Sequence, residues 1–231
     1  MSAEQLLFNL GEKKLDGRDQ LLRSQSNELA LKVVENFDTW PQNKLILVGP
    51  QGCGKSHISS ILASELDGLV VSAKNFDLSF IKIGGKDTIF ILEDMEKLAQ
   101  LEPNQKRAVE EAIFHFLVKY ENTDSKIFIT GVGNPALWDI SLPDLNSRLK
   151  TFLVAKIFEP DDQLFINLIL KNFSEKQLNV SPDILAFISA RIERTYASIR
   201  SFVNKVDAKA LRHKRKLTLD LVKSVLKDSD K

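Results

Sequence analysis

The sequence predicts an α/β domain, built on a parallel sheet flanked by helices, followed by a small all-helical domain. Three observations support this fold class. Between residues 44 and 157, short apolar runs alternate with stretches of helical spacing, which is typical of layered α/β domains. A glycine-rich turn joins the first of these runs to the first helical stretch. Beyond Pro160 only helical spacing remains, so the boundary between the domains is expected near residues 158–161.

The apolar runs are rich in valine, isoleucine and phenylalanine, which is typical of strands buried on both faces of a parallel sheet. The expected strands are Lys44–Val48, Leu69–Ser72, Thr88–Leu92, Ile127–Thr130 and Phe152–Ile157. Helices are expected between them at His57–Leu66 and Gln105–Tyr120. The second of these helices has an apolar stripe on one face, formed by Val109, Ile113, Phe116, Leu117 and Tyr120.

The segment after Pro160 is expected to form four helices. Apolar residues recur at helical spacing in Asp161–Phe173, Pro182–Ile192, Thr195–Leu211 and Thr218–Leu226. Ser181-Pro182-Asp183 is a typical helix start, because it combines a capping hydroxyl, a proline at the first position and an early acid. Thr218-Leu219-Asp220 is a second start of the same kind.

Composition narrows the class of protein. The chain has 231 residues with 32 basic against 31 acidic side chains, so no overall charge draws it onto nucleic acid or an anionic membrane. Its single cysteine, Cys53, excludes an internal disulfide and a multi-cysteine metal site, and fits a reducing compartment. The first residues lack the pattern of a secretory signal, and no apolar run is long enough to span a membrane. We therefore expect a cytoplasmic protein that makes no membrane contact.

A complete P-loop pattern follows the first predicted strand and opens the first predicted helix. It reads Gly49-Pro50-Gln51-Gly52-Cys53-Gly54-Lys55-Ser56. The glycines let successive backbone N–H groups point at phosphate oxygens, and the helix adds its positive N-terminal end. Lys55 is expected to reach the β- and γ-phosphates, and Ser56 to bind Mg²⁺. The alternative is a chance glycine-rich turn; Cys53 is interpreted as a small filler side chain.

Two acids end the third predicted strand, as a nucleotide-hydrolysing site requires. Glu93 is expected to support Mg²⁺ and Asp94 to orient the attacking water. Glu93 is one methylene longer than the aspartate usual at its position, and Asp94 has a short side chain for a general base. Both differences loosen the placement of the carboxylates, and a catalytic group misplaced by about 1 Å can lower the rate about a hundredfold. The pair therefore predicts nucleotide binding with slow intrinsic hydrolysis. A strand that ends in solvated acids is the alternative.

At these residues the chain resembles the DnaA-like branch of the AAA+ ATPases. Within that branch it is similar to the Hda-type regulators of the initiator DnaA, above all to their alphaproteobacterial form. The likeness covers nearly the whole chain and depends on a combination of segments, of which only the P-loop is strongly specific by itself. Besides the P-loop with His57 and the acid pair, the similar segments are Gly17-Arg18-Asp19 with Asn27, Asp38–Pro41, Leu142–Leu149, Glu159–Asp162 and Arg191–Arg194.

The resemblance implies an AAA+ α/β domain over residues 13–158 and a helical lid over residues 159–231. It implies that Ile127–Gly131 is the sensor 1 strand, with Thr130 near the γ-phosphate. It also implies that Arg148 is an arginine finger for a neighbouring protein's nucleotide, and it adds His57 to the nucleotide site. Spacing alone favours a surface arginine paired with Asp144.

The motif Ala197-Ser198-Ile199-Arg200 is similar to sensor 2, with Ala197 in place of the usual glycine. The resemblance implies that Arg200 reaches from the lid to the nucleotide phosphates. The four residues alone favour a solvated helix arginine, and Arg194 lies close in sequence. The preference between ATP and ADP stays open.

The first twelve residues resemble the clamp-binding peptide of this family. Gln5-Leu6-Leu7-Phe8-Asn9-Leu10 places a glutamine before apolar anchors, and Leu6, Leu7, Phe8 and Leu10 could fill a hydrophobic pocket while Gln5 makes a directional hydrogen bond. The pattern alone fits a frayed terminus or an edge strand equally well.

The resemblance implies a protein that binds ADP or ATP with Mg²⁺, docks on the DNA-loaded sliding clamp and presents Arg148 to ATP on DnaA. DnaA would then become ADP-bound and re-initiation of replication would be suppressed. The chain ends after the last lid helix, so no DNA-binding helix-turn-helix domain is expected. The alternatives are a helicase loader or other replication ATPase with its own turnover, and a binding module with a purely structural P-loop.

Two further features bear on nucleic acid. The basic run Arg212–Lys216 is either a solvated turn or a non-specific contact with clamp-loaded DNA. Trp40 and Trp138 are expected to pack in the core rather than stack on bases, because no aromatic side chains flank them in a basic groove. Homo-oligomerisation stays open.

Overall fold

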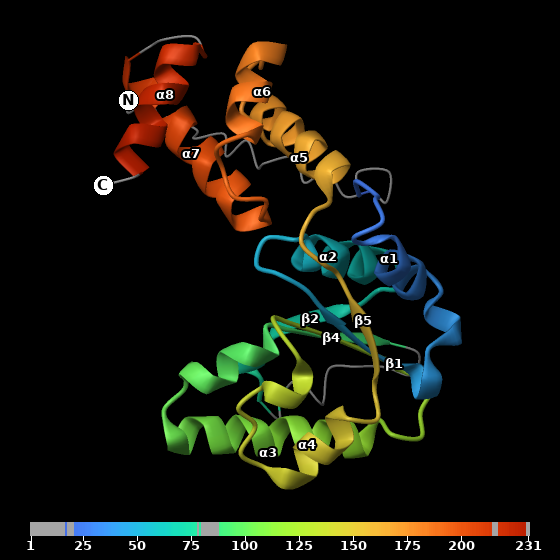
Figure 1. Ribbon diagram of the computed structural model, residues 1–231. Coiled ribbons are helices and arrows are strands. Elements are labelled where there is room, and N and C mark those ends of the chain that lie inside the picture. The colour runs from blue at the N-terminus through green and yellow to red at the C-terminus, as the bar shows by residue number, and fades with distance from the viewer. Residues whose placement is uncertain (1–16, 18–20, 78, 80–87, 214–216, 230–231) are drawn as a thin grey trace, which may run out of the picture.

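The computed structural model describes residues 17, 21–77, 79, 88–213 and 217–229. They form an α/β domain and a helical domain joined by the segment that follows the last strand (Figure 1). Among these residues no helix is both long and apolar enough to cross a bilayer.

The α/β domain is built on a five-stranded parallel sheet in the order β2-β3-β4-β1-β5. The strands are β1 (Lys44–Val48), β2 (Leu69–Ser72), β3 (Ile89–Glu93), β4 (Lys126–Gly131) and β5 (Leu153–Lys156). All five predicted strands are present, three of them with ends shifted by one residue. The order brings the carboxyl ends of β3, β4 and β1 side by side, and ligands of open α/β sheets bind at that edge.

Burial on both faces holds for the central strands but not for the edges. The side chains of β1 are buried throughout, as are those of β3 up to its last residue. In β2 none is fully buried, and in β5 only Ala155 is, while Val154 is 45% exposed. The expectation that every strand is buried on both faces is therefore wrong for β2 and β5. Each lies at an end of the sheet, where a neighbour is missing on one side.

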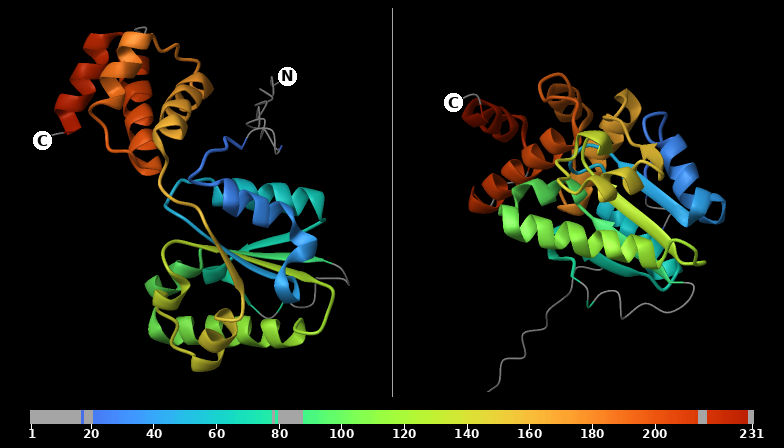
Figure 2. Two further views of the ribbon diagram at one scale, coloured as in Figure 1. Left: turned by 45° about the vertical axis from the view of Figure 1, so that its right-hand side comes forward. Right: turned by 90° about the horizontal axis from the view of Figure 1, so that it is seen from below.

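Helices cover both faces of the sheet (Figures 1 and 2). One face carries α1 (Glu28–Glu35) and α2 (Lys55–Glu65), and the other carries α3 (Pro103–Lys119) and α4 (Pro143–Leu149). The apolar stripe predicted on α3 is confirmed, since all five of its residues are at most 7% exposed. At its centre, the Phe116 ring packs edge-on against Phe90 with centroids 5.0 Å apart.

The core role expected of both tryptophans is confirmed. Trp40 is 3% exposed, stacks on Phe128 and donates its indole N–H to the Val33 carbonyl at 2.8 Å. Trp138 is buried as well and donates to the Val132 carbonyl at 2.8 Å. Each buried indole thus satisfies its one donor within the fold, as buried tryptophan requires.

The helical domain contains α5 (Asp162–Glu175), α6 (Pro182–Ser189), α7 (Tyr196–His213) and α8 (Leu219–Ser229). All four predicted helices are present, and they share an apolar core of their own. The predicted cap of α8 is confirmed, because Thr218 accepts the Leu221 N–H at 3.3 Å. The capping bond expected from Ser181 is not formed, and α6 ends earlier than predicted.

Asp161 caps α5 and ties the helical domain to the N-terminal segment. Its carboxylate accepts the Leu164 N–H at 2.9 Å and the Ser26 N–H at 3.3 Å. These hydrogen bonds, with one from the Ser24 hydroxyl, hold the pKa of Asp161 below its usual range. The capping role was not predicted, since the acid was counted only as the start of a helical stretch.

We expect Asp161→Ala to lower the free energy of unfolding by about 1 kcal/mol at neutral pH, because it leaves the end of α5 uncapped. Since folding lowers the carboxyl pKa, the contribution is present above the unfolded pKa near 4 and is lost as the pH falls through the depressed folded value. Thermal unfolding between pH 3 and pH 7 measures both effects. Asp161→Asn is the matched variant, because asparagine caps as well as aspartate but does not titrate in this range. Equal pH dependence in wild type and Asp161→Asn would contradict the assignment.

Candidate functional site

The P-loop forms the expected junction between β1 and α2. Gly52 and Gly54 have φ of +84° and +99°, in the left-handed region that favours glycine. A Cβ on Gly49 would lie 2.7 Å from the Cys53 sulfur. Burial raises the pKa of the Cys53 thiol, so this side chain is a packed, protonated filler rather than a reactive group.

Lys55 is the first residue of α2 and is only 7% exposed. Its ammonium donates to the carbonyls of Gly49 at 2.8 Å and Pro50 at 2.9 Å. These neutral partners satisfy its donors without cancelling its charge. The loop therefore holds a positive group at the N-terminal end of a helix, which is an arrangement suited to an anion.

The acid pair lies beside Thr130 at the end of the sheet. Glu93 ends β3, and one of its carboxylate oxygens, Oε1, is buried with no hydrogen-bond partner among the described residues. The Asp94 N–H donates to the Thr130 hydroxyl at 3.3 Å, and Thr130 is 1% exposed on β4. Because β4 also pairs with β1, with Thr130 beside Leu47, the structure brings the acids and Thr130 to the edge where the P-loop begins.

The two acids differ in whether their carboxylate oxygens already have a partner. Asp94 forms an ion pair of 2.6 Å with Lys97, and this contact raises the pKa of the lysine. The unpartnered oxygen of Glu93 is a hard donor of the kind that Mg²⁺ prefers, so Glu93 fits its expected role as a ligand together with the Ser56 hydroxyl. Within the described ranges, no group of three or more His, Cys, Asp or Glu side chains could hold a metal by itself.

A cavity of about 780 Å³ lies between the P-loop and the helical domain. This volume is within the range of small-molecule sites, about 300–1,000 Å³. One part of its wall is apolar and includes Leu22, Leu31 and Ile58. His57 also lines it, with Nε2 buried and unpartnered among the described residues.

The helical domain forms the opposite wall of the cavity. Of its two candidate arginines, only one lines the cavity. Arg200 lies on α7 and lines the cavity. Arg194 is instead ion-paired with Asp162 and does not line it. The sensor 2 role of Arg200, with Ala197 in place of glycine, stays a prediction.

Arg148 lies on α4, on the face of the sheet opposite the helical domain (Figures 1 and 2). It forms an ion pair of 2.7 Å with Glu121, and its guanidinium carbon lies 5.3 Å from the centre of the Phe114 ring. The pairing with Asp144 that spacing favoured is therefore wrong. Arg148 does not line the cavity of its own chain.

Comparisons with known proteins agree with this geometry. The family model described as "Hda, lid domain" matches residues 162–226. The chromosomal replication initiator DnaA of Zymomonas mobilis is 25% identical over 251 residues, covering 94% of this chain and 51% of the relative. The DnaA of Cutibacterium acnes is 26% identical over 205 residues, covering 80% and 40%. The chain thus spans about half the length or less of these curated relatives.

Solved structures show the same fold. Domain III of Thermotoga maritima DnaA superposes with a TM-score of 0.73 at 18% identity, covering 91% of this chain and 95% of that one. The Thermotoga maritima RuvB branch-migration motor gives 0.66 at 16% identity, covering 93% and 72%. The helical domain matches the family described as "Hda, lid domain", and the chain has the AAA+ fold of DnaA and RuvB. Its helical domain is the AAA+ lid.

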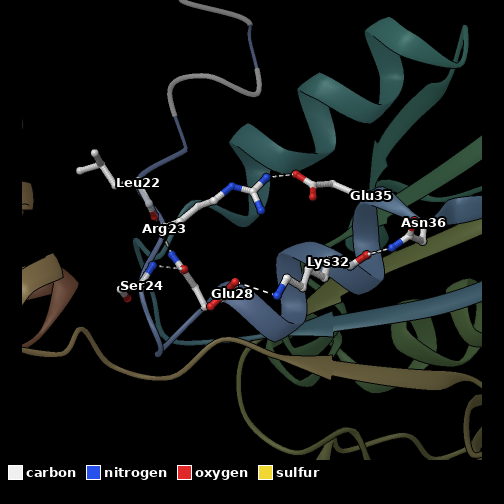
Figure 3. A network of polar contacts seen from close by, with 8 residues as sticks. Leu22, Arg23, Ser24, Glu28, Lys32, Glu35 and Asn36 are labelled. Carbon is white, nitrogen blue, oxygen red and sulfur yellow. Dashed lines mark hydrogen bonds and ion pairs between the residues drawn. The ribbon is translucent and has the colours of Figure 1, made fainter.

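The N-terminal segment of this AAA+ protein contains cavity residues to which sequence reasoning assigned no role. Asn27 accepts the Ser24 N–H at 2.9 Å and donates to the Leu22 carbonyl at 2.8 Å, which folds the segment against the cavity. Arg23 pairs with Glu35 and fastens the segment to the end of α1 (Figure 3). The similar segment Gly17-Arg18-Asp19 with Asn27 marked Asn27 in the sequence, but it did not predict the hydrogen bonds of Asn27 with Ser24 and Leu22.

Tyr196 is a second residue missed from the sequence of this AAA+ protein. It begins α7, is 6% exposed and belongs to the apolar cluster against which Cys53 of the P-loop packs. A Cβ on Gly52 would lie 3.6 Å from the Tyr196 Cβ. Its backbone N–H donates to Glu159 at 3.4 Å, and burial raises the pKa of its hydroxyl. It therefore connects the lid directly to the P-loop. An aromatic residue at a helix start gives no signal that distinguishes this contact from ordinary packing.

Two predicted sites of this AAA+ protein cannot be located. The clamp-binding peptide, with Gln5, Leu6, Leu7, Phe8 and Leu10, lies outside the described residues. Most of the basic run also lies outside them, at residues 214–216.

Proposed function

We propose that this protein binds ATP or ADP with Mg²⁺ and stimulates hydrolysis of the ATP held by DnaA, while docked on the DNA-loaded sliding clamp. The effect would be to inactivate the initiator and limit replication initiation. The observation that carries the proposal is the position of Arg148, which lies on the face of the sheet opposite the lid and outside the cavity of its own chain. From there, once it leaves Glu121, it can reach a nucleotide held by a neighbouring protein.

Nucleotide binding is supported by the cavity and by the fold's solved relatives. The P-loop residues Gly52–Gly54 and Arg200 line the cavity, and its apolar wall fits a base. Lys55 follows directly in the loop but does not line the cavity itself, because its ammonium is bonded to the loop carbonyls. One solved DnaA is described as bound to AMPPCP and single-stranded DNA, and it has a TM-score of 0.64 to this chain. We propose that the same type of ligand binds here, with Ser56 and Glu93 holding Mg²⁺, which when bound neutralises phosphate charge.

The chain's own hydrolysis is expected to be slow. Asp94, the residue proposed to orient water, is held by Lys97 at 2.6 Å and is a short base at this position. The Asp94 N–H donates a hydrogen bond to the Thr130 hydroxyl, which keeps the two residues side by side. The bound nucleotide would then serve chiefly to hold the lid against the P-loop through Arg200 and Tyr196.

In the proposed complex, Arg148 supplies positive charge where negative charge develops on the γ-phosphoryl group of DnaA-bound ATP. Its side chain is 28% exposed, so it can leave Glu121 without opening the core. The centre of the Phe114 ring lies 5.3 Å from the guanidinium carbon, and the ring adds a cation–π contact.

The decisive experiment measures ATP hydrolysis by DnaA in the presence of clamp-loaded DNA, with and without this protein. The proposal expects a clear increase in the rate of DnaA, together with a low rate for this protein by itself. If DnaA hydrolyses ATP no faster when the protein is added, the regulatory function is wrong. A high rate without DnaA would favour the helicase-loader alternative.

A double substitution of Gln5 and Phe8 by alanine tests the docking step. We expect clamp binding to weaken by about 30-fold or more, since an interface anchor contributes about 2 kcal/mol. Stimulation of DnaA should fall with it, whereas nucleotide affinity should not change. Asn9→Ala is the matched control, because Asn9 lies in the same segment but is not one of its proposed anchors. Undiminished clamp binding by the double variant, measured by surface plasmon resonance, would exclude the peptide as the docking element.

A further inference from the structure

Glu110, in the middle of α3, is a buried carboxylate that the proposed chemistry does not use. It is 0% exposed. It accepts the Ser141 N–H at 2.9 and 3.1 Å and the Leu142 N–H at 2.9 Å. Lys106 lies 4.0 Å away and forms an ion pair of 2.6 Å with Asp139. A charge buried this deeply is tolerated only when its partners are fixed, and here the partners are backbone amides.

These amides belong to the residues that lead into α4. The helix begins at Pro143, which has no N–H, and its cap residue Leu142 has no side-chain oxygen to satisfy the exposed amides. From another helix, Glu110 accepts the N–H groups of the cap residue Leu142 and of Ser141 before it. A side-chain cap at Leu142 would instead have accepted the N–H of Asp144 or Leu145. The position of α4 is fixed on α3 at this point.

The far end of α4 is held by the same helix and by the residues just after it. Phe114 lies four residues after Glu110, one turn further along α3, and stands below the Arg148 guanidinium. Glu121 follows α3 and pairs with the same guanidinium. Leu145 and Leu149 of α4 are buried in the core that this helix shares with the sheet.

We propose that Glu110 is a positioning residue for the arginine finger: its carboxylate fixes the start of α4 so that Arg148 is presented in one geometry to the nucleotide of DnaA. The inference builds on the proposed function, since it requires that Arg148 act in trans. Glu110 itself touches no nucleotide.

The test uses Glu110→Gln, which keeps the side-chain size but replaces one of the two acceptor oxygens with an NH2 group. With the amide oxygen at the Oε2 position, which bonds both amides, the NH2 group faces the Ser141 N–H and opposes it. We expect the maximal rate of DnaA-bound ATP hydrolysis to fall about 10–100-fold, because displacement of a catalytic group by about 1 Å has an effect of this size. The concentration for half-maximal stimulation and the nucleotide affinity should not change. Glu111→Gln is the matched control: the neighbouring acid is exposed and pairs only with Arg107 among the described residues, so this variant should behave as wild type.

Two further measurements separate positioning from general stability. In an Arg148→Ala background, Glu110→Gln should have no additional effect on the rate, because it acts only through that arginine. Amide hydrogen exchange should show lost protection in residues 141–149, with the strands of the sheet unchanged. Should Glu110→Gln fail to fold, Glu110→Asp keeps the charge beside Lys106 but withdraws the oxygens from the amides, and is expected to lose stimulation as well.

The outcomes distinguish the two proposals. If Arg148→Ala abolishes stimulation but both Glu110 variants retain the wild-type maximal rate, the role of Glu110 is wrong and the proposed function stands. Additive effects in the double variant, or unchanged exchange in residues 141–149, would also reject the role. If the wild-type protein does not stimulate DnaA, the proposed function fails and the positioning role fails with it.

Discussion

Replacing Arg148 with alanine is expected to lower the stimulated rate of DnaA-bound ATP hydrolysis by about 10³–10⁵-fold, which is the usual contribution of an arginine finger supplied in trans. The physical reason is that a guanidinium placed at the γ-phosphate stabilises charge that exists only in the transition state. Arg148 is the residue that α3 and Glu121 hold on the outer face of the α/β domain. Single-turnover hydrolysis of DnaA-bound ATP on clamp-loaded DNA measures the effect.

The fold of the Arg148→Ala variant should survive, which makes the experiment interpretable. Glu121 is 42% exposed, so water can solvate its carboxylate once the arginine is gone. Clamp binding and nucleotide affinity should therefore match wild type. Lys150→Ala is the control for charge, because Lys150 is an exposed cation at the end of the same helix. A variant without Arg148 that still stimulates DnaA fully would remove the basis of the regulatory proposal.

The sheet could be predicted because its central strands are buried on both faces and leave uninterrupted apolar runs. The same reasoning overestimated the burial of β2 and β5, since the sequence does not show which strands lie at the edges. Helices α1 and α4 were not predicted, because eight and seven residues carry few turns and neither helix begins with the Ser-Pro-Asp signal that indicated the equally short α6.

Some residues of the site could likewise be predicted from the sequence, and others could not. The P-loop, the acid pair and Thr130 follow strands that end at the same edge of the sheet, so local sequence placed them together. The contacts of Arg148 and Glu110 could not be predicted, because their partners are some 30 residues away and are fixed only by the packing of α4 on α3. The same holds for Tyr196, whose packing with the sheet-domain cluster that includes Cys53 joins the two domains.

Replacement of Lys55 by alanine is expected to weaken ATP and ADP binding about 10–150-fold, since a hydrogen bond from a charged group contributes about 1.5–3 kcal/mol. In the present structure the ammonium bonds two carbonyls of the P-loop. A phosphate is a stronger acceptor for it than either carbonyl, because both partners of the new bond are charged. Isothermal titration with each nucleotide measures the change. Lys32→Ala removes an exposed lysine on α1 that pairs with Glu28 and should leave both affinities unchanged.

The contacts of Lys55 also allow a purely structural role, in which the ammonium only holds the loop closed through Gly49 and Pro50. The two roles predict different results for the same variant. If Lys55 is structural, Lys55→Ala lowers the melting temperature of the free protein, whereas nucleotide affinity and stimulation of DnaA stay at wild-type values. If it binds phosphate, affinity falls, and ATP stabilises the variant less than the wild-type protein at the same concentration, because the stabilisation grows with the logarithm of ligand concentration over the dissociation constant. Thermal unfolding with and without ATP therefore decides between a P-loop that binds nucleotide and one that only shapes the fold.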